Sequence, residues 1–378
     1  MNKKWQTMLA VGLATAWASL SAVAADLPAL NIDLKQTTVS GISSGAFMAV
    51  QMGVAKSSFV RGVAVTAGGP YLCALDSAYS PTGVSGSIAR CMEGDPSFRL
   101  FASVKPLGDA DLDDMARRTK NLAKWKKIDP VEHLANQAVW VFHGYNDGIV
   151  KLPVSQGLIS WYQKFTPASQ VFHKDNLNAA HAQISAACSA STAVSGAADS
   201  CNICSTTGGK FINSCQDQPA ASNNAPYDAA GSALQMFYGP LTRTDTARLS
   251  AKPQAFSQMP FLKLYGGTSP VESGEVAMAD TGYLYVPQAC QAGQSGPACR
   301  LHIAFHGCMQ SATTIGTSFV DNGGVNEWAD ANRIVVLYPQ AMPTNFDVAH
   351  ASLKQPVNPM GCWDWWGYND NVARCLLY

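Results

Sequence analysis

One stretch of this chain strongly limits what it can fold into, the pentapeptide Gly-Ile-Ser-Ser-Gly at 41–45. A β-prone run ending at Val39 precedes it, and a helix-compatible run over 46–52 follows it. A G-x-S-x-G box between a strand and a helix is typical of a nucleophile elbow, in which a strained turn exposes the serine. The glycines let the strand and the helix approach closely, and the helix N-terminus directs amide donors at developing negative charge. We therefore predict that Ser43 is a nucleophile; the alternative is a surface turn rich in serine and glycine.

Short apolar runs alternate with helix-compatible segments along the rest of the chain. The runs predicted to be strands lie at 59–65, 137–142, 170–173, 282–287, 300–305 and 333–339. The segments predicted to be helices lie at 111–127, 154–164, 228–238 and 319–332. This alternation is typical of an α/β fold, a mostly parallel sheet with helices on both faces. No internal repeat or clear domain boundary interrupts it, so we predict a single domain.

The composition is that of a globular protein without an obvious affinity for nucleic acid. The chain has 378 residues, of which 47% are hydrophobic, and this is enough to bury a sizeable core. Its formal net charge is zero, and no basic patch stands out along the sequence. We therefore expect no nucleic-acid partner.

The first 25 residues have the pattern of a secretory signal peptide. Lys3 and Lys4 precede an apolar run over 8–20, and Ala22-Val23-Ala24 is a small-residue cleavage signal. The alternative is an uncleaved anchor, but the run is short for a membrane span. We predict a signal peptide at 1–25 and a catalytic domain at 26–378. No later stretch is apolar enough to span a bilayer, so we expect no stable membrane insertion after cleavage.

Eleven cysteines fit export to an oxidising compartment, either the periplasm or the medium. Their spacing predicts three disulfides: Cys73–Cys91, Cys290–Cys299 and Cys362–Cys375. Four further cysteines allow three connectivities, which stay open: 188, 201, 204 and 215. These four lie in a segment at 188–225 that we expect to be a loop region pinned by disulfides. The count is odd, and Cys308 is the candidate for an unpaired thiol because it stands apart from the clusters.

A serine nucleophile needs a base, usually histidine, and a carboxylate that orients the base. In open α/β sheets such groups lie in loops that follow the strands. Asp147 follows the predicted strand at 137–142, and His181 follows the strand at 170–173. The chain order Ser43, Asp147, His181 is that of α/β-hydrolases, so we predict that these residues form a catalytic triad.

Other residues compete for these roles. The acid has two alternatives, Asp129 and Asp175, and Asp147 itself could be an ordinary turn residue. The remaining histidines are at 133, 143, 173, 302, 306 and 350. Of these, His173 and His302 fall within predicted strands, where a structural role is expected.

The oxyanion hole should use the amide of Ser44, the residue after the nucleophile, and an amide from a loop after another strand. The segment His-Gly-Cys-Met-Gln at 306–310 follows the predicted strand at 300–305, and the Cys308 amide is the candidate donor. The alternative is that Cys308 is a structural cysteine paired elsewhere. In the common hydrolase order the oxyanion strand precedes the nucleophile, whereas here it follows the base. A circular permutation of the fold would produce this order.

Together these motifs resemble the catalytic domains of polyhydroxybutyrate (PHB) depolymerases whose lipase box lies near the N-terminus. The resemblance covers most of the mature chain and rests on the box at 41–45, Asp147, the His181 loop, the segment 306–310 and Gly-Cys-Trp-Asp-Trp-Trp-Gly at 361–367. It implies a circularly permuted α/β-hydrolase fold, with Ser43, Asp147 and His181 as the triad. It also implies an oxyanion hole of the Ser44 and Cys308 amides, and a substrate crevice lined by aromatic residues that include Trp365.

The activity implied by the resemblance is hydrolysis of poly(3-hydroxybutyrate) or its short oligomers through an acyl-enzyme, without metal or cofactor. An exposed tryptophan patch would bind such a polyester by burying apolar surface, at roughly 25 cal/mol per Å²; buried tryptophans would simply be core. One alternative is a feruloyl or acetyl-xylan esterase, whose motifs would look similar. The other is an inactive exported protein that binds the polymer.

Two departures from the family pattern affect what we expect of the substrate. Many secreted depolymerases carry a linker and a polymer-binding domain after the catalytic domain, and neither is seen in this sequence. We therefore expect poor binding of crystalline polymer and a preference for amorphous granules or soluble oligomers. The sequence also stops twelve residues after Trp366, where a further helix would be expected.

Overall fold

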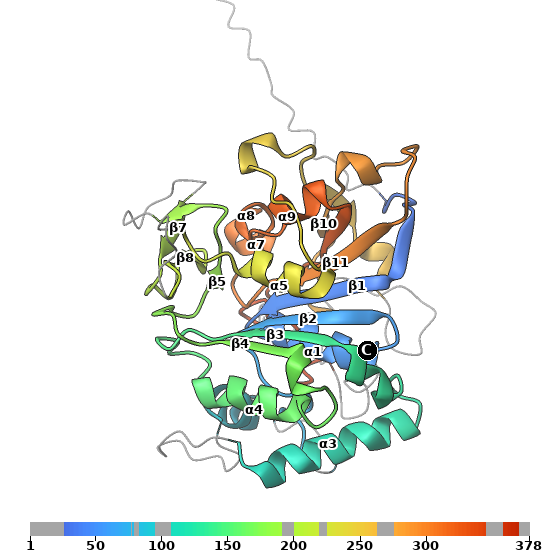
Figure 1. Ribbon diagram of the computed structural model, residues 1–378. Coiled ribbons are helices and arrows are strands. Elements are labelled where there is room, and N and C mark those ends of the chain that lie inside the picture. Colours follow the sequence, from blue (N-terminus) through green and yellow to red (C-terminus); the bar gives the residue numbers. More distant parts are fainter. Residues whose placement is uncertain are drawn as a thin grey trace, which may run out of the picture.

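A large sheet forms the centre of the computed structural model, which describes residues 26–76, 78, 83–94, 107–190, 200–218, 225–262, 276–344 and 358–369. The sheet has eight strands in the order β4-β3-β2-β1-β11-β12-β10-β9 (Figure 1). The strands are β1 (Ile32–Ile42), β2 (Val60–Thr66), β3 (Ala138–Phe142), β4 (Val171–Lys174), β9 (Gln254–Ser257), β10 (Thr281–Tyr285), β11 (Cys299–Phe305) and β12 (Ile334–Tyr338).

The sheet is parallel from β4 to β12, and at one edge β10 runs in the opposite direction and pairs antiparallel with both β12 and β9. Strand β11 lies directly beside β1, with Gly41 opposite Phe305, although the two strands are far apart in the chain. This places the strand before the 306–310 loop next to the strand before Ser43. The predicted fold class, a circularly permuted α/β-hydrolase with a mostly parallel sheet, is therefore confirmed.

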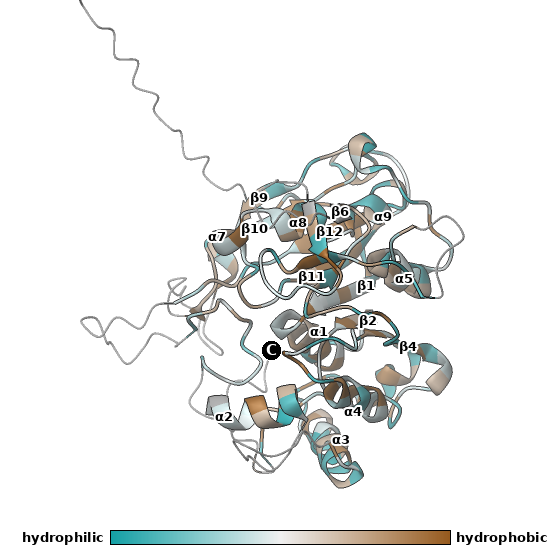
Figure 2. Ribbon diagram, turned by 90° about the vertical axis from the view of Figure 1, so that its left-hand side faces the viewer, coloured by the Kyte–Doolittle hydropathy of each residue, from teal (hydrophilic) through white to brown (hydrophobic). Residues whose placement is uncertain are grey.

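Helices cover both faces of the sheet (Figures 1 and 2). One layer contains α1 (Ser44–Ala55), α3 (Asp109–Lys124) and α4 (Leu152–Tyr162); the other contains α5 (Ala229–Tyr238), α8 (Ser318–Asn322) and α9 (Asn326–Ala331). In β3, Val139 and Val141 enter the core under α1 and α4, whereas Trp140 and Phe142 enter the core under α5 and α9. Because both faces are buried, the strands read as continuous apolar runs rather than alternating ones.

Several short elements complete the described part of the chain. They are α2 (Gly83–Ile88), a π-helical turn (Ala89–Glu93), α7 (Ala312–Ile315) and the 3₁₀ turns Val131–Asn136, Ala168–Gln170, Thr246–Arg248, Met259–Phe261 and Gln288–Cys290. The helix predicted at 319–332 is instead two helices, α8 and α9. They separate at Gly323-Gly324, where Gly324 has a φ of +86° that does not continue a helix. The antiparallel edge strand β9 was not predicted.

A second, smaller sheet forms the segment that was expected to be a disulfide-pinned loop region. Its strands are β5 (Gln183–Ile184), β6 (Ser189–Ala190), β7 (Ser200–Ile203) and β8 (Ile212–Ser214), in the order β5-β8-β7-β6. The structure resolves the connectivity that the sequence left open: Cys188 pairs with Cys201, and Cys204 pairs with Cys215. The pinned region is therefore confirmed, with short parallel strands inside it.

The other disulfides confirm two predictions and correct two. Cys73–Cys91 and Cys290–Cys299 form as predicted. Cys308 is not a free thiol, and Cys362 does not take the predicted partner Cys375, because Cys308 and Cys362 are bonded to each other across 54 residues of sequence. The sheet order brings these two segments together, and spacing along the chain carries no sign of that. Cys375 and the predicted signal peptide at 1–25 lie outside the described residues.

None of the described helices has both the length and the hydrophobicity that a membrane crossing requires.

Candidate active site

Ser43 occupies the turn between β1 and α1, as the sequence predicts. Its backbone has φ 55° and ψ −124°, a strained conformation for a residue with a side chain. The Ser43 amide donates to the Thr66 carbonyl of β2 (3.0 Å), and its own carbonyl accepts from the amides of Ala46 and Phe47. The strained turn is thus held from the neighbouring strand and from the first turn of α1.

The two glycines of the box are required by close backbone approach. A Cβ at Gly41 would lie 2.1 Å from the Gly45 carbonyl oxygen. A Cβ at Gly45 would lie 2.3 Å from the carbonyl oxygens of both Phe305 and His306. The first glycine therefore lets the chain reverse, and the second lets α1 start against the end of β11.

Asp147 and His181 form a buried hydrogen-bonded pair. The Nδ1 of His181 lies 2.8 Å from Oδ2 of Asp147, and the two residues are only 6% and 8% exposed. The other carboxylate oxygen, Oδ1, accepts from the amides of Ile149 (2.8 Å) and Val150 (3.1 Å). Burial by itself would raise the pKa of Asp147, but the hydrogen bond and charge of His181 and the hydrogen bond from the Ile149 amide hold that pKa below its usual value. An ionised Asp147 fixes the proton of His181 on Nδ1 and directs Nε2 away from the carboxylate.

The carboxyl ends of neighbouring strands bring these loops to one edge of the sheet. The Ala67 amide after β2 donates to the Phe142 carbonyl, and the His143 amide after β3 donates to the Lys174 carbonyl that ends β4. The loop after β4 is held in turn by the small sheet. There the Ala180 amide donates to the Cys204 carbonyl (2.9 Å), and the His181 amide donates to Oγ1 of Thr207 (3.3 Å).

The competing acids bond elsewhere. Asp129 accepts from the amide and the hydroxyl of Ser58, near the end of α1 opposite Ser43. Asp175 lies 3.8 Å from the His173 ring and is more exposed than Asp147. Among the described residues that the sequence offered as acids, Asp147 is therefore the one paired with His181.

Three other histidines are buried and neutral. His302 lies between the hydroxyls of Thr38 and Ser40, 2.8 Å from each, directly beneath the elbow. Burial lowers the pKa of His302 to about 3 and the pKa values of His143 and His306 to about 4. This confirms the structural role expected of His302. His133 is exposed, and His350 lies outside the described residues.

The loop after β11 lies against Ser43, since a Cβ at Gly307 would be 3.4 Å from the Cβ of Ser43. His306 donates from Nδ1 to the Gly307 carbonyl (2.7 Å) and accepts at Nε2 from the Ala341 amide (3.1 Å). The Gly307 amide donates to Oε1 of Gln310 (2.8 Å). In a trans peptide the carbonyl and the following amide point in opposite directions, so holding the Gly307 carbonyl orients the Cys308 amide.

The amides of Ser44 and Cys308 are available as donors, since neither has a protein acceptor within the described part of the chain. Sequence reasoning proposed both amides but missed His306 and Gln310, which hold the Gly307 peptide. The only sequence signal was that these residues flank the predicted donor, and nothing in the pattern says where their side chains point.

The tryptophans near the end of the described chain divide into core and surface. Trp363 is buried, and its Nε1 donates to the His306 carbonyl (3.0 Å). Trp365 is partly exposed and stacks on Phe47 of α1, with ring centroids 4.4 Å apart. Trp366 meets Trp365 edge-on. Trp365 therefore lies beside the first turn of the helix that follows Ser43.

No group of three or more histidine, cysteine or acidic side chains that could hold a metal ion occurs among the residues that the structure describes.

Comparison with known proteins gives one consistent result. No protein-family model matches the chain. The chain is 37% identical over 367 residues to a poly(3-hydroxybutyrate) depolymerase of Delftia acidovorans, covering 95% of this chain and 60% of that protein. It is 34% identical over 353 residues to a polyhydroxybutyrate depolymerase of Talaromyces funiculosus, covering 92% of this chain and 86% of that protein. This chain thus spans less than two thirds of the length of the Delftia protein.

Two solved structures are similar over nearly the whole fold. The PHB depolymerase from Penicillium funiculosum is 32% identical, with a TM-score of 0.68, and 91% of each chain is covered. A PHB depolymerase with a serine-to-alanine substitution, complexed with an R3HB trimer, is 30% identical, with the same TM-score and coverage of 91% and 92%.

Proposed function

Because this chain belongs to the polyhydroxybutyrate depolymerase family, we propose that it is an exported serine esterase that hydrolyses poly(3-hydroxybutyrate) or its short oligomers. One observation carries the proposal. A strained Ser43 and a buried Asp147–His181 hydrogen bond both lie where the parallel strands end, in the chain order of α/β-hydrolases.

The reaction would begin with transfer of the Ser43 hydroxyl proton to Nε2 of His181. The serine oxygen then attacks the ester carbonyl, and the charge that develops on the carbonyl oxygen is stabilised by the amides of Ser44 and Cys308. His181 returns the proton to the departing alcohol, which leaves a 3-hydroxybutyryl ester on Ser43. A water molecule activated by His181 hydrolyses that ester, and Asp147 stabilises the imidazolium in both halves of the reaction.

Each part of the site has an expected share of the rate. Base catalysis by a positioned histidine contributes about 10²–10⁴-fold. Each oxyanion donor contributes about 10²–10³-fold, provided that it points at the oxyanion and not at a protein acceptor. The absence of an acceptor for either amide within the described residues supports this role.

Trp365 is the proposed substrate contact. It is partly exposed and is fixed by stacking on Phe47, one helical turn after Ser43. An indole in this place can cover the methyl and methylene groups of a polyester chain next to the reacting ester. A related depolymerase is complexed with an R3HB trimer, which supports short oligomers as substrates.

Export is supported by the five disulfides among the described residues. We propose that residues 1–25 are a signal peptide and that residues 26–378 form the catalytic domain. The mature protein would then act in the periplasm or in the medium.

The test is release of hydroxybutyrate from amorphous poly(3-hydroxybutyrate) granules by wild type, Ser43→Ala and a control variant, Ser58→Ala. Ser58 is an exposed serine at the other end of α1, so its loss should leave the rate unchanged. We expect Ser43→Ala to lose about 10⁴–10⁶-fold in rate, as removal of a triad nucleophile does in other serine hydrolases.

Feruloyl and acetyl-xylan esters are assayed in parallel. Hydrolysis of these plant esters without release of hydroxybutyrate would overturn the polyester assignment and leave the triad in place. A wild type that hydrolyses no ester would instead favour the inactive polymer-binding alternative.

A further inference from the structure

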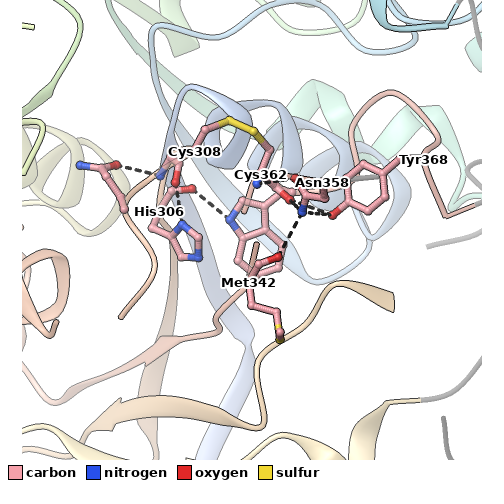
Figure 3. The surroundings of a disulfide bond; sticks show 9 residues. His306, Cys308, Met342, Asn358, Cys362 and Tyr368 are labelled. Carbon is pink, nitrogen blue, oxygen red and sulfur yellow. Dashed lines mark hydrogen bonds between the residues drawn. A yellow bond between two sulfur atoms is a disulfide. The ribbon is translucent and has the colours of Figure 1, made fainter. Parts of the chain in front are cut away.

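The loop that carries the Cys308 amide is tied to the segment 358–369 at three points, of which Figure 3 shows the disulfide. The covalent tie is the disulfide Cys308–Cys362, with a Cα–Cα distance of 4.2 Å. Beside it, the Met309 amide donates to the Met360 carbonyl (2.8 Å), and Nε1 of Trp363 donates to the His306 carbonyl (3.0 Å). His306, Cys308 and Met309 are thus all held by the segment 358–369, which is distant in sequence.

The loop needs such ties because secondary structure does not hold it. Strand β11 ends at Phe305 and α7 starts at Ala312, so Cys308 lies between them in an irregular stretch. Met309 has a positive φ of 61°, which an unsupported chain rarely adopts. The Cys308 amide has no acceptor among the described residues, so its direction depends on what holds the atoms on either side of it.

On the far side of the disulfide, Asn358 brackets the backbone of Cys362 (Figure 3). Its Oδ1 accepts from the Cys362 amide (2.9 Å), and its Nδ2 donates to the Cys362 carbonyl (2.9 Å). The Tyr368 hydroxyl donates to the same carbonyl (2.7 Å). Only a carboxamide supplies both a donor and an acceptor in this way, since an ionised aspartate would lose the donor.

Asn358 is itself anchored to the chain after β12. It is fully buried, its amide donates to Oγ1 of Thr344 (3.0 Å), and its carbonyl accepts from the Thr344 amide (2.9 Å). A continuous set of bonds therefore runs from the chain after β12, through Asn358 and Cys362, to the Cα of Cys308.

We propose that Cys362 and Asn358 are positioning residues of the reaction, which fix the direction of the Cys308 amide through the Cys308–Cys362 disulfide. This inference rests on the proposed esterase function and assigns a role to residues that do not touch the reacting atoms. An amide turned away from the oxyanion stabilises it poorly, so loss of the tie should reduce kcat. The KM for a small ester should change little, because such a substrate makes few contacts beyond Ser43.

The first test removes the disulfide with the double variant Cys308→Ala/Cys362→Ala, which leaves the Cys308 amide present and creates no new thiol. The matched control is Cys290→Ala/Cys299→Ala, which removes the disulfide at the opposite end of β11. The kcat and KM for p-nitrophenyl butyrate are measured beside the melting temperature, at a temperature where every variant is folded.

We expect a fall in kcat of about 10–100-fold for the site variant, within the range for an oxyanion donor, with KM within about threefold of wild type. The control should keep kcat within about twofold although its melting temperature also falls. Equal kcat values for the site variant and the wild type would overturn the inference. So would an equal loss in both double variants, since that would show a general effect of destabilisation.

A second variant keeps the test decisive if the double variant does not fold. Asn358→Asp preserves shape but loses the donor to the Cys362 carbonyl, and we expect kcat to fall about threefold to tenfold with unchanged KM. An unchanged kcat in folded Asn358→Asp would count against the proposal. Wild type and Ser43→Ala are assayed on the same ester: an inactive wild type refutes the proposed function itself, whereas an active wild type and an inactive Ser43→Ala leave only the positioning role in question.

Discussion

The proposed nucleophile and its proposed partners are positioned in two different ways. The elbow at 41–45 is continuous with β1 and α1, and its conformation is set by residues a few positions apart and by the neighbouring strands. The loops that carry His181 and Cys308 have little regular structure and are held from distant segments. The Cys308 loop is tied by its disulfide to Cys362, and the His181 loop is hydrogen-bonded to the segment that the Cys204–Cys215 disulfide pins. The comparison teaches that the elbow is placed by its own backbone geometry and the strands beside it, whereas the loops of the proposed base and oxyanion donor depend on contacts from distant segments.

The two regions meet most closely where Gly45 lies against the carbonyls of Phe305, the last residue of β11, and His306. A side chain there would push the elbow helix and the oxyanion loop apart. The nearest atoms are backbone oxygens, so they cannot move aside as the end of a flexible side chain can. This contact therefore offers the sharpest test of how rigid the elbow is.

Gly45→Ala is expected to have the largest effect. Its Cβ would lie 2.3 Å from two carbonyl oxygens, so we expect the free energy of unfolding to fall by more than about 3 kcal/mol. The measurement is urea unfolding followed by circular dichroism. The control is Gly148→Ala, whose Cβ would meet nothing within 4 Å and which should shift the unfolding free energy by less than about 1 kcal/mol. A Gly45→Ala protein as stable as wild type would show that the elbow is not rigid.

The contribution of the Cys204–Cys215 disulfide to the position of the His181 loop is tested by the double variant Cys204→Ala/Cys215→Ala. This disulfide closes a short loop, so its loss should lower the free energy of unfolding by about 3 kcal/mol. Because the Cys204 carbonyl holds the Ala180 amide beside His181, we also expect kcat to fall about tenfold through misplacement of the base.

The Cys290→Ala/Cys299→Ala variant again serves as the control, because its loop has a similar length. It should lose a similar amount of stability and keep its kcat when assayed below its melting temperature. If both variants kept their kcat, the disulfide of the small sheet would have no effect on the position of His181. The contrast between the elbow and the His181 loop would then be lost.

The smallest effect at neutral pH is that of the buried histidines, whose influence on stability grows only as the pH falls, and here the two regions should behave alike. His302 lies under the elbow and His306 lies beside Cys308, and burial lowers the pKa of His302 to about 3 and of His306 to about 4. The unfolded chain binds a proton at each below about pH 6.5, whereas the folded protein does not. Stability should therefore fall as the pH drops from about 6.5 towards 4, by about 1.4 kcal/mol per pH unit for each histidine.

The check is denaturant unfolding at several pH values for wild type and His302→Gln. The glutamine retains hydrogen-bonding capacity toward Thr38 and Ser40 but binds no proton. The free energy of unfolding of the variant should therefore depend less steeply on pH, by about 1.4 kcal/mol per pH unit. A slope equal to that of wild type would mean that His302 is protonated in the folded protein.

Much of the fold and part of the site followed from residues close together in the chain. The strand–turn–helix context of Ser43, the buried strands and the two short-range disulfides Cys73–Cys91 and Cys290–Cys299 were all predicted. The chain order also identified Asp147 and His181 as partners, and the structure places them 2.8 Å apart. These features depend on backbone sterics, hydrophobic patterning and short loop closure, which neighbouring residues decide.

Other features required the tertiary structure. The partner of Cys308 and the bracket that Asn358 forms around Cys362 were not predicted correctly or at all, and the burial of Trp363 was left open. Each depends on the segment 358–369 lying against the loop after β11, far from it in sequence. Such contacts are decided by the order and register of strands in the sheet, and only the folded chain brings those surfaces together.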